Sequence, residues 1–411
     1  MNVRPRYLVM VTENNNNKFY KQIPISDTEW KAEYGRVGSS PQTARYSMSQ
    51  WDKKYNEKIR KGYVDKTDLI EDAIVRVETK NPSDDFKTIE NKAIAEIVNE
   101  LQLMARNAIQ QNYTVNSSAV TQAMVDEAQF IIDDLMSYNS VKPFNQVLLD
   151  LFQVIPRAMG DVKKHLAKTS DDFAKIIKRE QDLLDVMRGQ VIQNKVVSGV
   201  KEESNKPKND KTILEHLGLT FEECTEEDIA RIKVCLGSCA PNFARAWKVI
   251  NHQTQERFDA FIKENNIKET KLLFHGSRNE NWWSIICGGL KLRPTNAVIT
   301  GKLYGMGTYF ASKAKKSMGY TSLRGSYWAN GSSNKGYMAL MEVAYGTPYD
   351  VYTFDSKYYN LNYEKLQQFQ KGANCLHAHA GADIGHTSLR NDEIVIYKEE
   401  QCTIKYLVEL V

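Results

Sequence analysis

The chain has 411 residues, of which 42% are hydrophobic and 26% charged, and its formal net charge is +4. This length predicts two or three domains that each bury a core. The small net charge excludes a protein that is basic over its whole surface, although not a local basic face. Because no run of about 18 apolar residues and no secretory signal occur, we expect an intracellular protein without a membrane span.

Short strand-like runs and turns occupy residues 1–75. Strands are expected at 7–11, 18–23 and 30–38, with a hairpin loop at 14–17 and a helix over 49–61. Trp51 and Tyr55 would share one face of that helix, because they lie four residues apart. Between residues 31 and 66, nine residues are basic and four are acidic. The pattern predicts a small β-rich domain with a local excess of positive charge.

Helical periodicity takes over in residues 82–198. Apolar side chains recur at three- and four-residue spacing, and Pro156 is expected to end one of the helices. This pattern predicts an all-α bundle of about five or six helices. Residues 199–212 are charged and polar without an apolar period, so we expect an exposed linker there.

Strands, turns and short helices dominate residues 210–411. Thr225 and Asp228 have the spacing of a capping box, and residues 243–249 alternate as a strand does. The region is therefore predicted to be a mixed α+β domain. No GxGxxG opens a helix and no GxxxxGK[ST] occurs, which argues against a Rossmann dehydrogenase and a P-loop ATPase.

The six cysteines and three of the seven histidines are candidate metal ligands. The cysteines form no CxxC pair, which indicates reduced thiols in an intracellular protein. His377, His379 and His386 lie in a segment rich in Gly, Ala and Asn, without cysteine partners, so a surface loop is expected there. We therefore predict no metal site.

Three segments carry one polar side chain each at the edge of an apolar or glycine-rich strand. They are Phe274–Arg278, Gly305–Phe310 and Asn391–Tyr397. In this order they resemble the His-Tyr-Glu signature of the poly(ADP-ribose) polymerase family. The resemblance implies an ADP-ribosyltransferase fold in which NAD, the substrate, lies in a cleft between two small antiparallel sheets.

The same resemblance implies a role for each residue around the nicotinamide. His275 would bond the adenine-side ribose, while Gly276 and Ser277 would hold the nicotinamide amide. Tyr309 and Tyr320 would stack on the two faces of the nicotinamide ring. The remaining positions that match family NAD contacts are Lys291, where the family usually has arginine, and Ser317, which follows the basic residue Lys316. A further departure is Ser284, where glycine is usual.

Glu393 is the residue expected to carry the reaction, with His275 and Tyr309 as the other members of the signature. Cleavage of the nicotinamide–ribose bond builds oxocarbenium character on the sugar, which a nearby carboxylate stabilises. Asp392 would point to the opposite face of the strand and be solvated. Glutamate at this place accompanies chain elongation in the family.

The N-terminal and helical regions resemble the two other parts of DNA-dependent family members. Phe19–Tyr20 and Tyr34–Gly38 resemble a WGR domain, with Tyr34 where Trp is usual, and residues 152–157 resemble the regulatory helical domain. The resemblance implies that Tyr34 stacks on a DNA end and that Arg36 reaches a phosphate. The alternative is a small β-domain whose exposed arginine solvates a turn.

We therefore expect three domains: a WGR-like DNA-end-binding domain over 1–75, a helical regulatory domain over 82–198 and a catalytic domain over 210–411. The expected activity is DNA-break-stimulated transfer of ADP-ribose from NAD to proteins, itself included, with elongation to poly(ADP-ribose). The alternatives are a mono-ADP-ribosyltransferase and a catalytically weak DNA-end scaffold. The expected compartment is the nucleus in a eukaryote, and the cytoplasm or nucleoid for a bacterial or viral protein.

Overall fold

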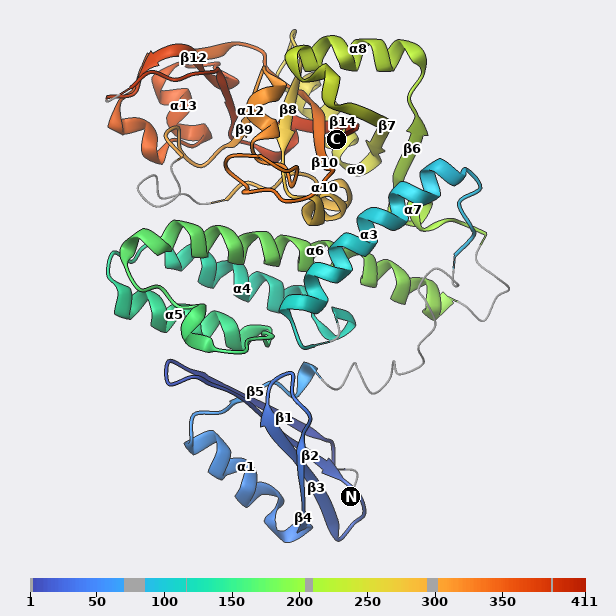
Figure 1. The fold of residues 1–411 in the computed structure, drawn as a ribbon, viewed down its shortest axis with the longest axis vertical. Helices are drawn as coiled ribbons and strands as arrows, with labels where there is room; N and C mark the ends of the chain where they lie inside the picture. Colours follow the sequence, from blue (N-terminus) through green and yellow to red (C-terminus); the bar gives the residue numbers. More distant parts are fainter. Residues whose placement is uncertain (1–2, 70–85, 116, 204–209, 294–301, 386) are drawn as a thin grey trace. The chain divides into compact units, whose positions relative to one another are not determined.

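The structure is a computed structural model of the chain. It describes residues 3–69, 86–115, 117–203, 210–293, 302–385 and 387–411 (Figure 1). The chain divides into two compact units: unit 1 comprises residues 1–81 and 106–194, and unit 2 comprises residues 82–105 and 195–411. The three predicted domains stay a prediction, and their boundary between residues 75 and 82 lies outside the described residues.

Unit 1 contains a five-stranded antiparallel sheet. Its strands are β1 (Arg6–Thr12), β2 (Asn16–Pro24), β3 (Glu29–Arg36), β4 (Gln42–Ser47) and β5 (Val64–Asp65). Their order in the sheet is β4-β3-β2-β1-β5. The predicted strands 7–11 and 18–23 lie inside β1 and β2, while the strand predicted at 30–38 ends earlier, because β3 stops at Arg36. A hairpin joins β1 to β2 as predicted, but its loop is shorter than 14–17 because β2 already begins at Asn16. Asn15 turns the hairpin with a φ of 63°, a left-handed conformation that Asn tolerates better than most residues.

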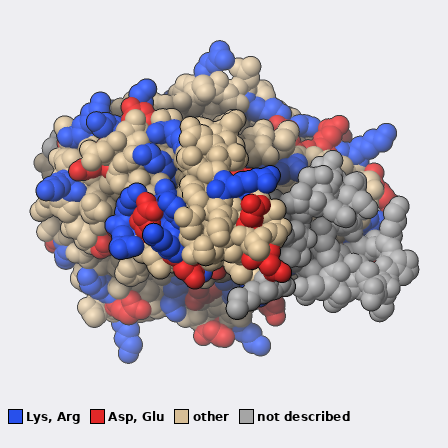
Figure 2. All heavy atoms as spheres, turned by 90° about the horizontal axis from the view of Figure 1, so that it is seen from below, with Lys and Arg blue, Asp and Glu red and all other residues tan. Residues whose placement is uncertain are grey.

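One face of this sheet is covered by helix α1 (Trp51–Arg60), as the spacing of Trp51 and Tyr55 predicted. Trp30 and Trp51 are buried and meet edge to face with ring centroids 5.3 Å apart. The helix carries several cations, and on the molecular face drawn in Figure 2 the Lys and Arg side chains are interspersed with Asp and Glu.

The described residues of the helical region form four α-helices and short 3-10 turns, fewer than the five or six helices that the sequence predicted. The α-helices are α3 (Lys92–Asn112), α4 (Gln122–Leu135), α5 (Val141–Val154) and α6 (Phe173–Glu203). Helix α5 ends just before Pro156, as predicted. The predicted linker at 199–212 is wrong at its start, because α6 continues to Glu203; Lys and Glu are good helix formers, so charge alone does not end a helix.

Buried polar contacts join the sheet of unit 1 to its helical residues and also hold those helical residues together. The Asn17 side chain is buried and donates to the carbonyl of Arg157 at 3.0 Å. Arg157 forms a buried ion pair with Glu180, 2.5 Å between Nη1 and Oε2. The charge in this core is therefore paired, which a buried charge requires.

Unit 2 contains a five-stranded antiparallel sheet in the order β6-β7-β14-β10-β8. Its strands are β6 (Leu219–Glu223), β7 (Phe243–Asn251), β8 (Lys271–Gly276), β10 (Gly336–Val343) and β14 (Cys402–Leu410). The central strands β10 and β14 are buried along almost their whole length. The predicted strand at 243–249 and the Thr225 capping box of α8 (Glu226–Leu236) are both confirmed.

A second, four-stranded sheet in unit 2 has the order β11-β12-β13-β9. Its strands are β9 (Thr308–Phe310), β11 (Pro348–Thr353), β12 (Cys375–Asp383) and β13 (Glu393–Ile396). β11 and β12 pair in parallel, which differs from the expectation of purely antiparallel sheets. The crossover between them contains α13 (Tyr363–Phe369), because parallel neighbours cannot be joined by a tight turn.

The remaining α-helices in the described residues of unit 2 are α7 (Ile213–His216), α9 (His252–Glu264), α10 (Trp282–Gly288) and α12 (Ala314–Met318). Unit 2 is a mixed α+β structure, as predicted. All six cysteines lie in the described part of the chain and are free thiols. None of the helices in that part combines the length and the apolar character needed to cross a bilayer.

Candidate active site

The three segments singled out in the sequence meet where the two sheets of unit 2 adjoin. Backbone hydrogen bonds between Phe274 and Ala311 join β8 to the end of β9. In the next pair of strands, Tyr309 of β9 lies opposite Val395 of β13, two residues from Glu393. His275 adds a bond from its ring Nδ1 to the carbonyl oxygen of Tyr309, at 3.2 Å. Segments separated by more than 100 residues therefore form one site.

His275 is a neutral ring with one nitrogen still available. Burial lowers the pKa of His275 to about 4, because the charged form loses its hydration. A carbonyl oxygen only accepts hydrogen bonds, so the neutral ring donates from Nδ1 to Tyr309. The Nε2 atom is then an acceptor, which suits a ligand hydroxyl group.

Gly276 lies where α12 approaches β8 most closely. A Cβ atom on Gly276 would overlap the carbonyl oxygen of Ser317, so no larger residue fits without moving α12. The buried Ser317 hydroxyl donates to the Phe274 carbonyl at 3.1 Å and fixes the same contact. Ser277 accepts from the Asn281 side chain at 3.0 Å. The glycine is thus required by the protein itself, in addition to the ligand access predicted from the sequence.

Tyr309 uses its hydroxyl group inside the protein. The oxygen accepts from the Tyr304 amide at 2.9 Å and donates to the Gly305 carbonyl at 3.2 Å. Burial raises the pKa of Tyr309 well above its ordinary value, so the phenol stays protonated. The ring is therefore held rigidly and offers its face rather than its hydroxyl to a ligand.

Two aromatic residues, Tyr320 and Trp328, are exposed. Tyr320 is 37% exposed and stacks on Trp328, with centroids 6.1 Å apart. Burial of the hydroxyl, together with the charge of Glu393, raises the pKa of Tyr320 to about 12. The charge of Glu393 also contributes to the raised pKa of Tyr309, so both rings lie within electrostatic reach of this carboxylate.

Glu393 begins β13 and is held by a lysine. Lys316 Nζ lies 2.5 Å from Glu393 Oε1 and donates to the Asp392 carbonyl at 3.3 Å. Both side chains of the pair are less than one-fifth exposed. Asp392, predicted to be solvated, is 29% exposed and also accepts from the Ala380 amide at 2.8 Å and from Ser312 at 3.2 Å.

Sequence reasoning missed Lys302, which follows the segment left undescribed at 294–301. Its ammonium lies 5.6 Å from the centre of the Tyr309 ring. Burial, with a smaller contribution from Arg293, lowers the pKa of Lys302 to about 8. No local pattern distinguishes this lysine from others in the chain, because its proximity to Tyr309 depends on the folded loop.

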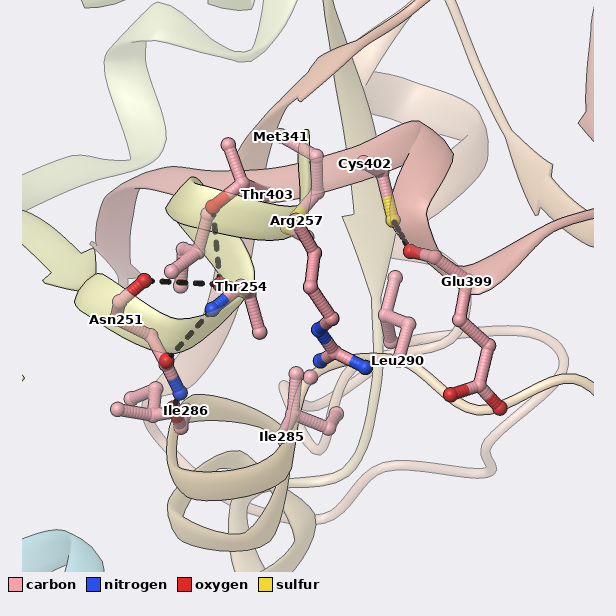
Figure 3. A pocket seen from close by; sticks show the side chains of 12 residues that line it. Asn251, Thr254, Arg257, Ile285, Ile286, Leu290, Met341, Glu399, Cys402 and Thr403 are labelled. Carbon is pink, nitrogen blue, oxygen red and sulfur yellow. Dashed lines mark hydrogen bonds between the residues drawn. The ribbon is translucent and has the colours of Figure 1, made fainter. Parts of the chain in front are cut away.

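Lys291, predicted to contact the adenosine side, is paired with Glu399 at 2.7 Å. Glu399 also lines a small pocket between α9, α10 and β14, in which Arg257 points between Ile285 and Leu290 (Figure 3). None of the predicted site residues lines this pocket, and its polar groups Asn251 and Thr254 bond each other. We conclude that it is a gap in packing, separate from the site of Glu393.

Comparison with known proteins agrees with this geometry. The model of the poly(ADP-ribose) polymerase catalytic domain matches residues 237–411. Invertebrate iridescent virus 6 has a putative poly [ADP-ribose] polymerase-like protein, 100L, that is 34% identical over 173 residues, 40% of this chain and 84% of that protein. Its uncharacterized protein 101L is 32% identical over 46% of this chain and 77% of its own length.

A plant relative extends the similarity to a longer stretch. Poly [ADP-ribose] polymerase 2 of Zea mays is 26% identical over 244 residues, 57% of this chain and 36% of the maize protein. The matched catalytic domain and the mixed α+β fold of unit 2 support an ADP-ribosyltransferase. The chain belongs to the poly(ADP-ribose) polymerase family.

Proposed function

We propose that the chain transfers ADP-ribose from NAD to protein side chains and releases nicotinamide. The convergence of His275, Tyr309 and Glu393 supports the proposal most strongly, because each presents a different capability at one place: a hydroxyl acceptor, an aromatic face and a carboxylate. Domains of this family use NAD as substrate.

The proposed binding mode follows from which atoms remain available. The backbone of Gly276 and the hydroxyl of Ser277 hold the nicotinamide amide, while Tyr309 and Tyr320 flank its ring. His275 Nε2 accepts from a ribose hydroxyl of the adenosine half. The rigid Tyr309 ring reduces the ordering cost of binding, because its hydroxyl is already bonded to the backbone.

In the proposed reaction the bond between ribose C1′ and the nicotinamide nitrogen breaks, and its electron pair leaves with nicotinamide. Glu393 stabilises the positive charge that develops on the sugar, as a carboxylate does in glycoside cleavage. An acceptor oxygen then forms the new bond to C1′ and loses its proton to solvent or to the carboxylate. Lys316 fixes the position of Glu393 through the ion pair between the two side chains.

We further propose that the product is extended to poly(ADP-ribose). The support is the glutamate at position 393 and the names of the plant relatives, which are called polymerases. The acceptor for elongation would be a ribose hydroxyl of the growing chain, which Glu393 can also polarise. A denaturing gel of labelled product distinguishes a ladder from a single modification, and the single band would establish mono-ADP-ribosylation instead.

The N-terminal region is proposed to bind DNA ends and to stimulate the activity. Because Arg36 is engaged inside the protein, the phosphate contacts are assigned to exposed cations of the same region, Arg45 on β4 and Lys53 on α1. Neutralising both residues should weaken binding to blunt or nicked DNA and reduce its salt dependence, since each phosphate contact releases a counterion. An unchanged salt slope would contradict this assignment.

The helical region is proposed to regulate the catalytic domain. Residues 92–105 of α3 belong to unit 2, where Glu100 pairs with Lys335 at 2.9 Å. Residues 106–112 of the same helix belong to unit 1, so a change in unit 1 has a continuous helix through which to act. The variant Glu100→Gln should raise the activity measured without DNA more than the activity measured with DNA.

Incubation of the purified chain with NAD labelled in the adenylate half tests the main proposal. We expect label on protein and an equal molar release of nicotinamide, both increased by DNA ends. Acceptor protein should be optional, because the chain is proposed to modify itself. Release of nicotinamide without protein-bound label would identify an NAD hydrolase and contradict the transfer.

A further inference from the structure

Two histidines that the sequence placed in a surface loop lie on a strand instead. His377 and His379 belong to β12, while His386 lies outside the described residues. The alternation Leu376-His377-Ala378-His379 places both histidines on the same face, because successive side chains of a strand point to opposite faces. Asp350 of the parallel neighbour β11 is paired in register with His377. Three residues that could bind a metal therefore share one surface of the four-stranded sheet.

The three side chains are already close together. The candidate ligand atoms of Asp350, His377 and His379 lie within 4.8 Å of one another. The two imidazole rings stack with centroids 3.9 Å apart, so their nitrogens are held side by side. His379 Nε2 is 2.7 Å from Asp350 Oδ1. The Nε2 atom of His377 is buried without a hydrogen-bond partner, which is a costly state for a polar atom.

His377 is oriented by a neighbour outside the cluster. Its Nδ1 lies 2.8 Å from the Tyr345 hydroxyl. When Nδ1–H donates to that oxygen, the lone pair of Nε2 is left facing Asp392, whose Oδ2 is 3.7 Å away. In metal-binding histidines, a hydrogen bond from the ring nitrogen that does not bind the metal fixes the tautomer of the ring. Asp392 supplies a fourth candidate ligand from the segment that leads into β13.

We propose that Asp350, His377, His379 and Asp392 bind a divalent transition-metal ion, for which Zn²⁺ is the best match. Two imidazoles with carboxylates suit zinc, whereas Mg²⁺ and Ca²⁺ prefer oxygen ligands alone. Tetrahedral zinc with bonds of about 2.0–2.2 Å needs ligand atoms roughly 3.4 Å apart. Side-chain movements on the order of 1 Å would close the cluster around the ion.

The site is distinct from that of Glu393. In the pairing of β12 with β13, His377 lies opposite Ile394 and Ala378 opposite Glu393. Glu393 therefore points to the other face of the sheet from the two histidines. The metal would link β11, β12 and the residue preceding β13, so its role is to stabilise this sheet rather than to polarise NAD.

Solvent reaches the candidate metal ligands. The side chains of Asp350 and His379 are 43% and 27% exposed, and that of Asp392 is 29% exposed. The exposed ring of Tyr352 stacks on His379, with centroids 4.5 Å apart, and helps to hold this histidine in place. An ion can therefore reach the ligands without unfolding of the sheet.

The test uses the full chain without a histidine tag, freed of metal by a chelator. Calorimetric titration with Zn²⁺ should give one ion per chain, and Co²⁺ should develop the visible absorption of a tetrahedral site. His377→Ala and His379→Ala should each abolish the stoichiometric binding. His252→Ala is the matched control, because His252 is an exposed histidine bonded to Thr220 elsewhere in unit 2.

Two further variants keep the test decisive if an alanine variant fails to fold. Asp350→Asn alters an exposed ligand and should weaken Zn²⁺ binding, while Tyr345→Phe removes only the orienting hydroxyl and should weaken it about 10–100-fold. Saturating Zn²⁺ should also raise the unfolding temperature of the wild type but not of the ligand variants. Absence of saturable one-to-one binding by the wild type, or equal binding by the His252, His377 and His379 variants, would overturn the proposal.

Discussion

The two units use their conspicuous polar residues in opposite ways. In unit 2, Glu393 and His275 each have one partner and keep an atom available for a ligand. In unit 1, Arg36 donates to the Asn15 carbonyl and side chain at 3.0 and 2.9 Å and lies 3.4 Å from the Met159 carbonyl. Tyr34 is half-buried and packs near Tyr20, with centroids 6.2 Å apart.

A residue can belong to a sequence motif without being available to bind a ligand. A motif tells which residue types recur at a place, but their hydrogen-bond partners decide whether a group can serve a ligand. The Arg36 guanidinium spans the hairpin and the helical residues of unit 1, which is a structural use. Neither the predicted phosphate contact nor the alternative of a solvated turn describes that arrangement.

The buried ion pair of unit 1 should give the largest stability effect. In Glu180→Gln, the Arg157 charge stays buried without its counterion, so we expect a loss of about 3–5 kcal/mol of unfolding free energy. Denaturant unfolding followed by circular dichroism measures it. Glu57→Gln removes a surface partner of Lys61 and should cost less than about 1 kcal/mol. Equal losses of unfolding free energy in the two variants would mean that burial does not determine how much an ion pair contributes to stability.

His275 predicts a dependence of stability on pH. Its folded pKa of about 4 lies below the ordinary value of 6.5, so between these pH values the unfolded chain binds more protons. The contribution of His275 to the unfolding free energy is therefore fully present above about pH 6.5. It is lost as the pH falls toward 4, by on the order of 3 kcal/mol. His275→Gln should flatten the curve relative to wild type. Parallel curves for the two proteins would refute the neutral, buried ring.

The variant Gly276→Ala tests whether the close approach of Gly276 to α12 is needed for activity. Because the new methyl group would overlap the Ser317 carbonyl, we expect displacement of α12 and about a 100-fold loss of NAD turnover. Gly160→Ala is the control, since a Cβ at Gly160 meets nothing within 4 Å. Turnover within a factor of two of wild type for Gly276→Ala would show that the close approach is not needed.

Arg36→Gln should have the smallest effect of the series. Loss of charged hydrogen bonds to Asn15 is expected to cost about 1–3 kcal/mol, with faster amide exchange in the β1–β2 hairpin. Arg45→Gln, at an exposed arginine of the same sheet, should change stability by less than about 0.5 kcal/mol. A stable Arg36→Gln protein that no longer binds DNA ends would support the predicted phosphate contact. It would contradict the purely structural role assigned to Arg36.

Elements with a strong local period were predictable from the sequence. The strands around Leu8 and Trp247 and the helix of Trp51 follow from alternation and four-residue spacing, and Pro156 marks a helix end. The continuation of α6 through residues 199–203 was not, because polarity was taken as a helix stop although Lys and Glu favour helices.

The features that could not be predicted from the sequence depend on contacts between residues far apart in the chain. The histidine pattern of residues 376–379 alternates as a strand does, and this signal could have placed His377 and His379 correctly. Nothing local predicts that Asp350 lies beside them, that Trp328 stacks on Tyr320, or that Lys302 lies over Tyr309. Such contacts arise from crossovers and loops, for which a single sequence carries no periodic signal.

Separate measurements of NAD binding and nicotinamide release for the wild type and Glu393→Gln test the role of Glu393 most directly. The amide keeps the shape of the carboxylate but loses the charge that stabilises the transition state, so kcat should fall by about 10²–10⁴-fold. The NAD dissociation constant should stay nearly unchanged, because the charge acts mainly in the transition state. Glu364→Gln, at an exposed glutamate of α13, should match the wild type in both measurements. A large rise in the dissociation constant with unchanged turnover would contradict the role assigned to Glu393.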